Sequence, residues 1–232
     1  TDSHWNPRGQ DVAAEALAQY QCLILSDIGA NTLLLHPDTF TKSIVRTVAS
    51  SVGRAIVGAI TPSSPELAAE MLIGITPDDH NIVLELGVGT GALTKDLREA
   101  VPSRNSYLGI ELDPDLVKTL NKNFPDMNIV CGSAVDAYSI HRESGLGKVR
   151  YVVCCLPFAW LPKEISDSVL AEIQKFMDEG CELRIFQYAH GYYLPPAIKL
   201  REMMKKRYGK LHRSPLILKN VPPAFTLTWS TV

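Results

Sequence analysis

The sequence predicts an α/β fold with a mostly parallel sheet, because a buried strand, a glycine turn and a helix follow one another near its middle. Residues 82–86 form an apolar run with one acid, Glu85, as expected for a strand that is buried on both faces. Three glycines, each separated from the next by one residue, follow directly. From Ala92 onward, apolar residues recur at helical spacing. A ligand can approach bare backbone at such a turn, where the helix starts.

The three glycines are Gly87, Gly89 and Gly91. Their strict alternation differs from a dinucleotide-binding turn, whose third glycine comes three residues after the second. With Glu85 in front of them, they resemble motif I of class I S-adenosylmethionine (AdoMet) methyltransferases. The resemblance implies that these four residues help to bind AdoMet. The alternative is an ordinary strand-to-helix turn without a ligand.

Composition narrows the classes of function. A chain of 232 residues suits one α/β domain with a helical extension, and its net charge of −2 gives no global attraction for nucleic acid, although a local basic patch stays possible. The five cysteines are odd in number and include no CxxC pair, so we expect free thiols rather than disulfides or a metal site. No apolar run is long enough to span a bilayer and no secretory signal is visible, which favours a cytoplasmic protein.

The chain is expected to divide into an N-terminal helical extension, residues 1–64, and a main domain, residues 65–232. Within the extension, apolar residues recur at helical spacing over residues 41–60, while Lys42, Arg46 and Arg54 lie mostly on the opposite side. This weakly basic amphipathic helix either lies on a membrane surface or packs against the main domain, and the pattern alone favours packing.

Two serines stand at the junction with the main domain. Ser64 followed by Pro65 predicts the N-cap and the first residue of a helix. The hydroxyls of Ser63 and Ser64 either only cap this helix or also reach the carboxylate of a ligand.

The second strand, residues 106–110, ends at Glu111, which lies 20 residues after Gly91. In nucleotide-binding α/β folds an acid at this place accepts hydrogen bonds from both ribose hydroxyls, so we assign Glu111 to the ribose. Capping of the next helix is the alternative role, and it fits Asp113 better. The neighbouring Leu112 is expected to cover one face of the adenine.

The third strand, residues 127–131, leads into Gly132, Ser133 and Ala134. Many methyltransferases have an aspartate after this glycine, and it bonds the adenine amino group. Ser133 stands in its place, so either its hydroxyl makes the contact or the contact passes to Asp136. Ser133 and Ala134 are therefore candidates for the cofactor site. Residues 141–148 are predicted to form a polar surface loop.

The fourth strand, residues 150–155, is followed by the segment Leu156-Pro157-Phe158-Ala159-Trp160. Residues after this strand face the methyl donor in such a fold. The carbonyl of Leu156, held by Pro157, is a candidate to accept a hydrogen bond from a substrate nitrogen, and Phe158 and Trp160 are candidates to surround that nitrogen. A hydrophobic loop that covers the sheet edge is the alternative, above all for Trp160.

The fifth strand, residues 182–187, is followed by three phenols and one imidazole, those of Tyr188, Tyr192, Tyr193 and His190. Tyr188 or His190 is a candidate to remove a proton from an ammonium substrate, which exposes the lone pair for attack. Tyr192 and Tyr193 are candidate substrate-binding residues, because aromatic rings stabilise a growing quaternary ammonium by cation–π contact. A single histidine is more often structural, and this alternative stays open for His190. Residues 215–219 and 224–230 are predicted to be two final strands.

Three further segments are more specific than motif I: Pro62-Ser63-Ser64, Leu156-Pro157-Phe158 and Pro222-Pro223-Ala224-Phe225. With them, the chain from about Ser43 to its end resembles the bacterial phospholipid N-methyltransferases, including the related ornithine-lipid methyltransferases. The resemblance implies a Rossmann-like class I methyltransferase fold. This is a three-layer α/β/α arrangement, and its seven-stranded, mostly parallel sheet has an antiparallel last strand.

The same resemblance implies an activity, the AdoMet-dependent, stepwise methylation of the amine of phosphatidylethanolamine or of ornithine lipid, with no metal and no nucleic acid. It favours membrane contact for the helix over residues 41–60, and so a cytoplasmic protein that associates peripherally with an anionic membrane. Three departures from the family affect the substrate more than the cofactor. Ser133 replaces the aspartate, the glycine expected before Leu156 is missing, and residues 1–40 have no counterpart.

Three other functions stay open. An rRNA adenine N6-methyltransferase has a similar Leu-Pro-aromatic loop, but normally with an asparagine before it, where this chain has Cys155. A soluble small-amine N-methyltransferase differs from the lipid enzyme only in the membrane helix. A non-catalytic AdoMet-binding protein is disfavoured by Glu111 and by the complete aromatic loop.

Overall fold

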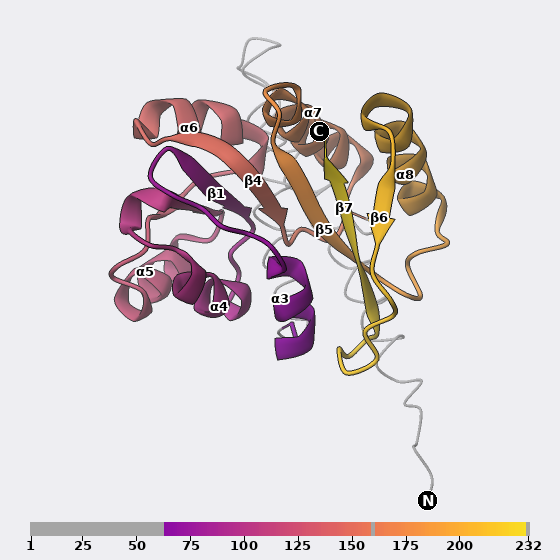
Figure 1. Ribbon diagram of the computed structural model, residues 1–232, viewed down its shortest axis with the longest axis horizontal. Helices are drawn as coiled ribbons and strands as arrows, with labels where there is room; N and C mark the ends of the chain where they lie inside the picture. Colours follow the sequence, from indigo (N-terminus) through magenta and orange to yellow (C-terminus); the bar gives the residue numbers. More distant parts are fainter. Residues whose placement is uncertain (1–62, 159–160, 231–232) are drawn as a thin grey trace, which may run out of the picture. The chain divides into compact units, whose positions relative to one another are not determined.

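The computed structural model describes residues 63–158 and 161–230, which belong to one compact unit, Thr61–Val232. The predicted amphipathic helix over residues 41–60 and the candidate Trp160 lie outside the described residues. Within the described part, seven strands form one sheet in the order β3-β2-β1-β4-β5-β7-β6 (Figure 1). The strands are β1 (Asn81–Leu86), β2 (Tyr107–Glu111), β3 (Ile129–Cys131), β4 (Lys148–Cys154), β5 (Glu182–Tyr188), β6 (Leu211–Arg213) and β7 (Ala224–Ser230).

The order of the strands places the switch point of the sheet beside β1. The chain passes from β1 outward to β2 and β3, returns to β4 on the other side of β1, and continues to β5. These strands all pair in parallel, so their carboxyl ends meet at one edge, where open α/β sheets bind their ligands. β7 runs antiparallel to β5, and β6 runs antiparallel to β7. The predicted seven-stranded, mostly parallel sheet is confirmed.

Helices cover both faces of this sheet, which confirms the predicted three layers. α3, α4 and α5 lie on one side, and α6, α7 and α8 lie on the other (Figure 1). Each helix turns an apolar stripe inward, as α7 does with Ile165, Val169, Ile173 and Phe176. The helices are α3 (Pro65–Leu72), α4 (Ala92–Ala100), α5 (Pro114–Asn123), α6 (Ala137–Ser144), α7 (Lys163–Asp178) and α8 (Pro195–Tyr208).

Side-chain caps fix the starts of two helices, as the sequence predicts. Ser64 Oγ accepts a hydrogen bond from the backbone N of Leu67 at 3.1 Å, and Pro65 is the first residue of α3. Asp113 Oδ1 accepts from the backbone N of Asp115 at 2.9 Å at the start of α5. Both caps satisfy amide groups that have no partner inside the helix.

The predicted surface loop over residues 141–148 is confirmed only for residues 145–147, because α6 extends to Ser144 and β4 begins at Lys148. His141 is buried, its Nε2 lies 2.8 Å from the carbonyl oxygen of Gly147, and its ring meets that of Phe176 edge-on at 5.6 Å. The prediction was wrong because a hydrophobicity pattern counts histidine as polar, whereas this imidazole is part of the core.

The end of the chain also differs from the prediction. β6 is Leu211–Arg213, and residues 215–219 belong to a loop that meets β7 through the isolated bridge between Ile217 and Ala224. Ser214 Oγ accepts from the backbone N of Thr226 at 2.9 Å, and Pro215 has no N–H to continue the ladder. The strand therefore ends before Pro215.

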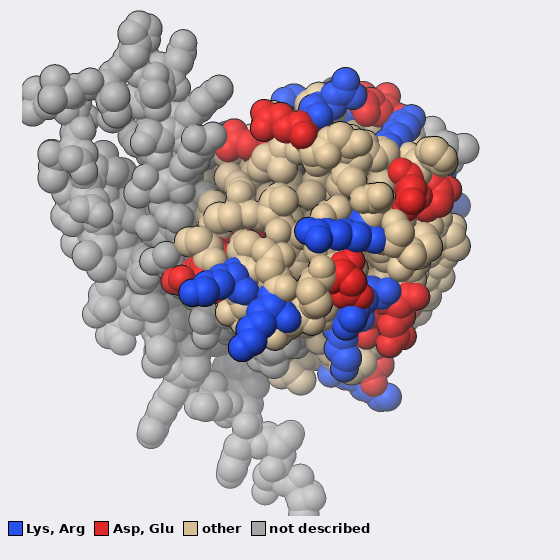
Figure 2. Space-filling model, turned by 90° about the vertical axis from the view of Figure 1, so that its left-hand side faces the viewer, with Lys and Arg blue, Asp and Glu red and all other residues tan. Residues whose placement is uncertain are grey.

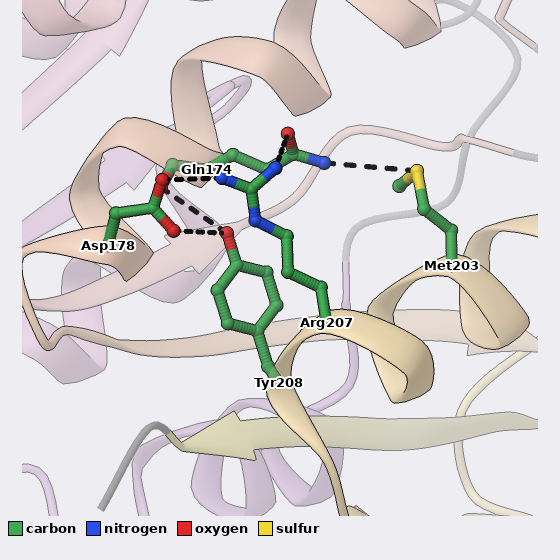
Figure 3. Close-up of polar contacts among 5 residues, drawn as sticks. All are labelled: Gln174, Asp178, Met203, Arg207 and Tyr208. Atoms are coloured by element: carbon green, nitrogen blue, oxygen red, sulfur yellow. Dashed lines mark hydrogen bonds and ion pairs between the residues drawn. The ribbon is translucent and has the colours of Figure 1, made fainter.

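Polar contacts join α7 to the last turns of α8 (Figure 3). Arg207 Nη2 lies 2.6 Å from Asp178 Oδ2, and Arg207 Nη1 donates to Gln174 Oε1 at 3.1 Å. Tyr208 donates its hydroxyl proton to Asp178 Oδ1 at 3.0 Å, and Gln174 Nε2 lies 3.8 Å from the sulfur of Met203. Arg207 is therefore engaged in packing one helix on another.

Candidate active site

The glycine turn after β1 combines three left-handed residues that have different surroundings. Gly87, Gly89 and Gly91 have φ values of 77°, 59° and 81°. A Cβ on Gly87 would lie 2.7 Å from Leu156 Cδ2, and one on Gly91 would lie 2.7 Å from Phe124 Cε2. A Cβ on Gly89 would meet no atom of the described residues within 4 Å. A side chain at Gly87 or Gly91 would therefore displace a neighbouring side chain, whereas the described residues leave space at Gly89 in which a ligand can approach the backbone.

Glu85 is fully buried at the base of this turn. Its Oε2 accepts hydrogen bonds from Thr94 Oγ1 at 2.9 Å and from the Tyr107 hydroxyl at 2.5 Å. Its Oε1 is buried and has no hydrogen-bond partner among the described residues. Burial raises the pKa of Glu85 to about 7, against the opposing effect of the two hydroxyl donors. Because this oxygen is shielded from solvent, a contact between Glu85 and AdoMet stays a prediction.

Thr94 and Tyr107 are site residues that the sequence did not single out. Thr94 lies in the first turn of α4, and Tyr107 opens β2. Their apolar neighbours make both positions part of a predicted helix or strand, but which hydroxyl reaches Glu85 depends on how α4 and β2 pack around β1.

The carboxylate of Glu111 is held beside Gly89. Its Oε2 accepts from the backbone N of Gly89 at 2.8 Å, and its Oε1 accepts from the backbone N of Asp113 at 2.9 Å. Because a carboxylate has about four acceptor positions, both oxygens retain capacity for the ribose hydroxyls. Asp113 caps α5 itself, so Glu111 is not the cap. Leu112 is half-buried next to it, and the assignment to ribose and adenine stays a prediction.

Ser133 and Ala134 reach the same edge of the sheet as Glu111. The backbone N of Gly132 donates to the carbonyl oxygen of Glu111 at 2.8 Å, which sets the end of β3 beside the end of β2. Ser133 Oγ accepts from the backbone N of Val135 at 3.4 Å and caps the short helix η2 (Ala134–Asp136). This hydroxyl thus has a structural role, and its contact with adenine stays a prediction.

Of the two serines before α3, Ser64 has hydrogen-bond partners within the fold. Ser64 caps the helix with its hydroxyl, and its backbone N donates to Oδ1 of the buried Asn220 at 2.9 Å. Ser63 is half-buried. The predicted contact of Ser63 or Ser64 with the carboxylate of a ligand stays a prediction.

The loop after β4 packs directly on the glycine turn. The backbone N of Cys155 donates to the carbonyl oxygen of Leu86 at 2.9 Å, and the side chain of Leu156 lies against Gly87. The carbonyl oxygen of Leu156 accepts from the backbone N of Phe158 at 3.0 Å, and the side chain of Phe158 is buried. The fold therefore already uses one acceptor position of this carbonyl, and its second one remains for the predicted substrate nitrogen.

Tyr188 and His190 form a stacked pair at the carboxyl end of β5. Their ring centroids lie 5.6 Å apart and their planes differ by 10°. Burial raises the pKa of Tyr188 and lowers the pKa of His190. At pH 7 the imidazole is therefore neutral and the phenol protonated. Of the two candidate bases, His190 is the one whose protonation state suits the removal of a proton.

The predicted substrate-binding tyrosines do not form one cage. Tyr193 is exposed, whereas Tyr192 is buried, and their rings meet edge-on at 5.2 Å. The guanidinium carbon of Arg201 lies 3.7 Å from the centroid of the Tyr192 ring, and that of Arg213 lies 5.4 Å from it. The cation nearest to Tyr192 is thus supplied by the protein itself. The sequence gave no sign of this contact, because α8 and β6 bring the arginines to the ring.

Comparison with known proteins places this geometry in a class. Residues 83–180 match the family described as Methyltransferase domain. An ornithine lipid N-methyltransferase from Singulisphaera acidiphila is 27% identical over 124 residues, which cover 52% of this chain and 65% of that protein. The ribosomal RNA small subunit methyltransferase A of Cupriavidus metallidurans is 31% identical over 105 residues, which cover 45% of this chain and 35% of that protein. The chain thus spans less than two thirds of the length of these relatives. A second family, described as Putative glutamine amidotransferase, matches residues 3–51, outside the described part.

Solved structures show the same fold at low sequence identity. Precorrin 8W decarboxylase from Methanobacterium thermoautotrophicum superposes with a TM-score of 0.55 at 14% identity, covering 74% of this chain and 94% of that one. TrmK of M. capricolum, in complex with S-adenosyl-homocysteine, gives 0.52 at 8% identity, covering 74% and 70%. With the family match, these findings confirm the predicted class I fold. The chain thus has the class I fold, and its residues 83–180 match a methyltransferase domain.

The position of Gly89 leads to a prediction with a matched control. Gly145 also has a positive φ and open space around an added Cβ, but it follows α6. Gly89→Ala and Gly145→Ala should each cost about 1–2 kcal/mol of backbone strain in denaturant unfolding. Only Gly89→Ala should also weaken AdoMet binding in calorimetry, by roughly tenfold or more, because its methyl group takes the space of the ligand. Equal affinities in the two variants would contradict the placement of AdoMet at Gly89.

The burial of Glu85 predicts a pH dependence of stability. Because the folded-state pKa of about 7 exceeds the ordinary value of 4.5, the folded state binds more protons between these two pH values than the unfolded state does. The contribution of Glu85 to the free energy of unfolding should therefore fall by about 3 kcal/mol as pH rises through this interval, and level off above pH 8. Denaturant unfolding of the wild type and of Glu85→Gln across pH 5–8 isolates the contribution of Glu85 to the free energy of unfolding. Parallel pH curves for the two proteins would show that Glu85 titrates normally.

Proposed function

We propose that this protein is an AdoMet-dependent N-methyltransferase that transfers methyl groups to the amine headgroup of a membrane lipid, either phosphatidylethanolamine and its methylated derivatives or ornithine lipid. The observation that carries the proposal is the stacked pair of Tyr188 and His190 at the carboxyl end of β5. It gives the acceptor side of the site an aromatic surface together with a base that is neutral at pH 7. The ornithine lipid N-methyltransferase among the relatives supports the same substrate class.

The reaction needs a neutral amine, because only its lone pair can form the new bond to carbon. AdoMet, when bound, supplies a methyl group on a positively charged sulfur, which becomes a neutral thioether as the carbon–sulfur bond breaks. His190 is neutral at pH 7, because partial desolvation lowers its pKa, and it can therefore accept the proton that the ammonium loses. The ring of Tyr188 then stabilises the methylated ammonium by cation–π contact, which needs no N–H and therefore suits every product of stepwise methylation, including the quaternary one.

On the cofactor side, the residues of this chain orient the bound AdoMet and exclude water, and they take no part in bond making or breaking. Glu111 is fixed by two backbone amides beside Gly89, and it can hold the ribose without moving. Leu156 and the buried Phe158 close the site from the β4 side and keep water from it. Positioning of this kind can supply most of the acceleration of a transfer between two bound partners.

Access to a lipid requires contact with a membrane surface. Among the described residues, no helix is both long and apolar enough to cross a bilayer. We propose a peripheral association with anionic lipid through the amphipathic helix predicted over residues 41–60. Adding anionic vesicles and sedimenting them tests this step, and a protein that stays in the supernatant with every lipid composition would count against it.

An rRNA adenine methyltransferase is the second candidate, because several relatives carry that description. Two observations favour the lipid. Cys155 precedes the Leu156-Pro157 pair where the rRNA enzymes normally have asparagine. On the side of the molecule that carries α5 and α6, the described Lys and Arg residues are interspersed with Asp and Glu (Figure 2). Such a mixed surface gives little attraction for a nucleic-acid backbone.

The deciding experiment is methyl transfer from labelled AdoMet, offered in parallel to extracted bacterial lipids, to small amines and to ribosomal RNA. We expect label in mono-, di- or trimethylated phosphatidylethanolamine or in ornithine lipid, resolved by headgroup on a chromatogram. Label confined to RNA or to soluble amines would overturn the lipid proposal. If the protein binds AdoMet normally but transfers no methyl group to any of these acceptors, it is an AdoMet-binding protein without this activity.

The role of His190 gives a second prediction. His190→Gln should lower kcat with lipid by about tenfold or more at pH 7, because the amine must then lose its proton without a base. The loss should shrink as pH rises toward the pKa of the amine itself. His212→Gln, on the exposed end of β6, is the matched control and should keep the activity of the wild type. A deficit of His190→Gln that is independent of pH would assign the imidazole a structural role.

A further inference from the structure

The loop between β6 and β7, residues 214–223, exposes a cluster of aliphatic side chains. Leu216, Leu218 and Val221 are 38%, 71% and 68% exposed. They are three of the six large apolar side chains that are exposed in the described part of the chain. Single exposed apolar residues are ordinary on a protein surface, whereas a cluster of them in one loop is typical of a surface that binds a partner.

The fold holds this loop in a defined shape. The backbone N of Ile217 donates to the carbonyl oxygen of Ala224 at 2.8 Å, and the backbone N of Ala224 donates to that of Ile217 at 3.3 Å. The buried side chain of Asn220 accepts from the backbone N of Ser64 at 2.9 Å and donates to the carbonyl oxygen of Pro222 at 2.6 Å. The loop is therefore tied to β7 and to the start of α3, and its exposed aliphatic side chains take no part in these bonds.

The loop lies beside the acceptor side of the candidate site. β7 begins at Ala224, which pairs with Tyr188, the last residue of β5. The backbone N of Ala189 donates to the carbonyl oxygen of Pro223 at 2.7 Å, and Ala189 lies between Tyr188 and His190 in the chain. The loop extends beyond the carboxyl ends of the parallel strands (Figure 1). Whatever covers the aliphatic cluster is therefore brought close to the stacked aromatic pair.

The charges around the cluster favour an anionic partner. The described stretch from Leu211 to Ser230, which comprises β6, the loop and β7, contains no Asp or Glu. Arg213 in this stretch is exposed, and its guanidinium carbon lies 4.8 Å from the ring centroid of Phe225. Lys219 Nζ lies 3.0 Å from Glu66 Oε1 in an exposed ion pair. Aliphatic side chains with cations at their margin suit the interface of an anionic bilayer, where hydrocarbon lies beneath a negative layer.

We propose that Leu216, Leu218 and Val221 insert into the interface of an anionic lipid bilayer and bring the stacked aromatic pair at the end of β5 to the level of the headgroups. The inference rests on the proposed function, because a lipid substrate places a bilayer at this edge of the sheet. It adds a second contact to the one proposed for residues 41–60. The helix holds the protein on the membrane, and the loop sets the orientation of the acceptor side.

Ile73 provides a matched control for this surface. Its side chain is 63% exposed, and it follows α3, whose first turn carries Glu66 near the loop. Three residues further on, Thr76 Oγ1 lies 3.4 Å from the hydroxyl oxygen of Tyr151, near the amino end of β4. Ile73 thus exposes an aliphatic side chain of similar size toward the opposite edge of the sheet.

Protection from a polar reagent tests the insertion directly. Leu218→Cys and Ile73→Cys are each made in the full chain and treated with a charged maleimide. Vesicles of phosphatidylethanolamine and phosphatidylglycerol are present or absent, and peptide mass spectrometry measures labelling at each position. We expect the vesicles to slow labelling at position 218 by about tenfold or more, and at position 73 by less than about twofold, because only the first enters the bilayer.

Three results of this experiment would overturn the inference. The first is equal labelling of the two positions under conditions in which the protein sediments with the vesicles. The second is protection of position 218 without vesicles that increases with protein concentration, which would identify a second copy of the chain as the partner. The third is slow labelling of position 218 without vesicles at every concentration, which would show that another part of the chain covers the loop.

Methyl transfer separates this inference from the proposed function. Leu218→Ser combined with Val221→Ser should raise KM about tenfold for phosphatidylethanolamine or ornithine lipid in vesicles, because two aliphatic side chains no longer leave water. Activity with the soluble glycerophosphoethanolamine or ornithine should stay unchanged, and Ile73→Ser should match the wild type throughout. An equal loss with the soluble compounds would overturn the inference, because the loop would then shape the site itself. Methylation of lipid without protection at position 218 removes only the inference, whereas a wild type that methylates no lipid removes the proposed function.

Discussion

The buried carboxylate of Glu85 joins the three elements on which the site depends. It lies on β1, and its hydrogen bonds to Thr94 and Tyr107 tie it to α4 and β2. An acid in this position is costly, because burial disfavours its charged form. The hydrogen bonds from the two hydroxyls offset part of this cost. The carboxylate thus holds β1, β2 and α4 together, and this fixes the geometry of the glycine turn between β1 and α4.

The features that the sequence predicts correctly are those that depend only on residues close together in the chain. The strand over Asn81–Leu86, the glycine turn and the caps at Ser64 and Asp113 depend on neighbours within a few residues, and the structure has them as predicted. His141 was missed because its environment is set by α7, far along the chain. The end of β6 was missed because the Ser214 hydroxyl replaces a backbone partner of β7. Patterns within one segment carry no information about such contacts.

The candidate site divides in the same way. Glu111 and the three glycines could be placed from spacing alone, because the fold requires them at fixed distances from β1. The aromatic residues after β5 could be recognised as a group, but their separate roles could not. Tyr188 stacks on His190, Tyr192 lies under Arg201, and Tyr193 is exposed. The four aromatic residues look alike in the sequence pattern, but the helices and strands that pack around them give them three different environments.

The net charge of the chain and the local distribution of its charges point to different kinds of partner. A net charge of −2 argues against a polyanionic partner, and the mixed surface over α5 and α6 agrees with it. Arg201 and Arg213 nevertheless lie close together at the ring of Tyr192, where Glu202 also acts on the charge of Arg201. A single anionic group needs only two well-placed guanidinium groups, whereas a nucleic-acid backbone needs a continuous basic surface.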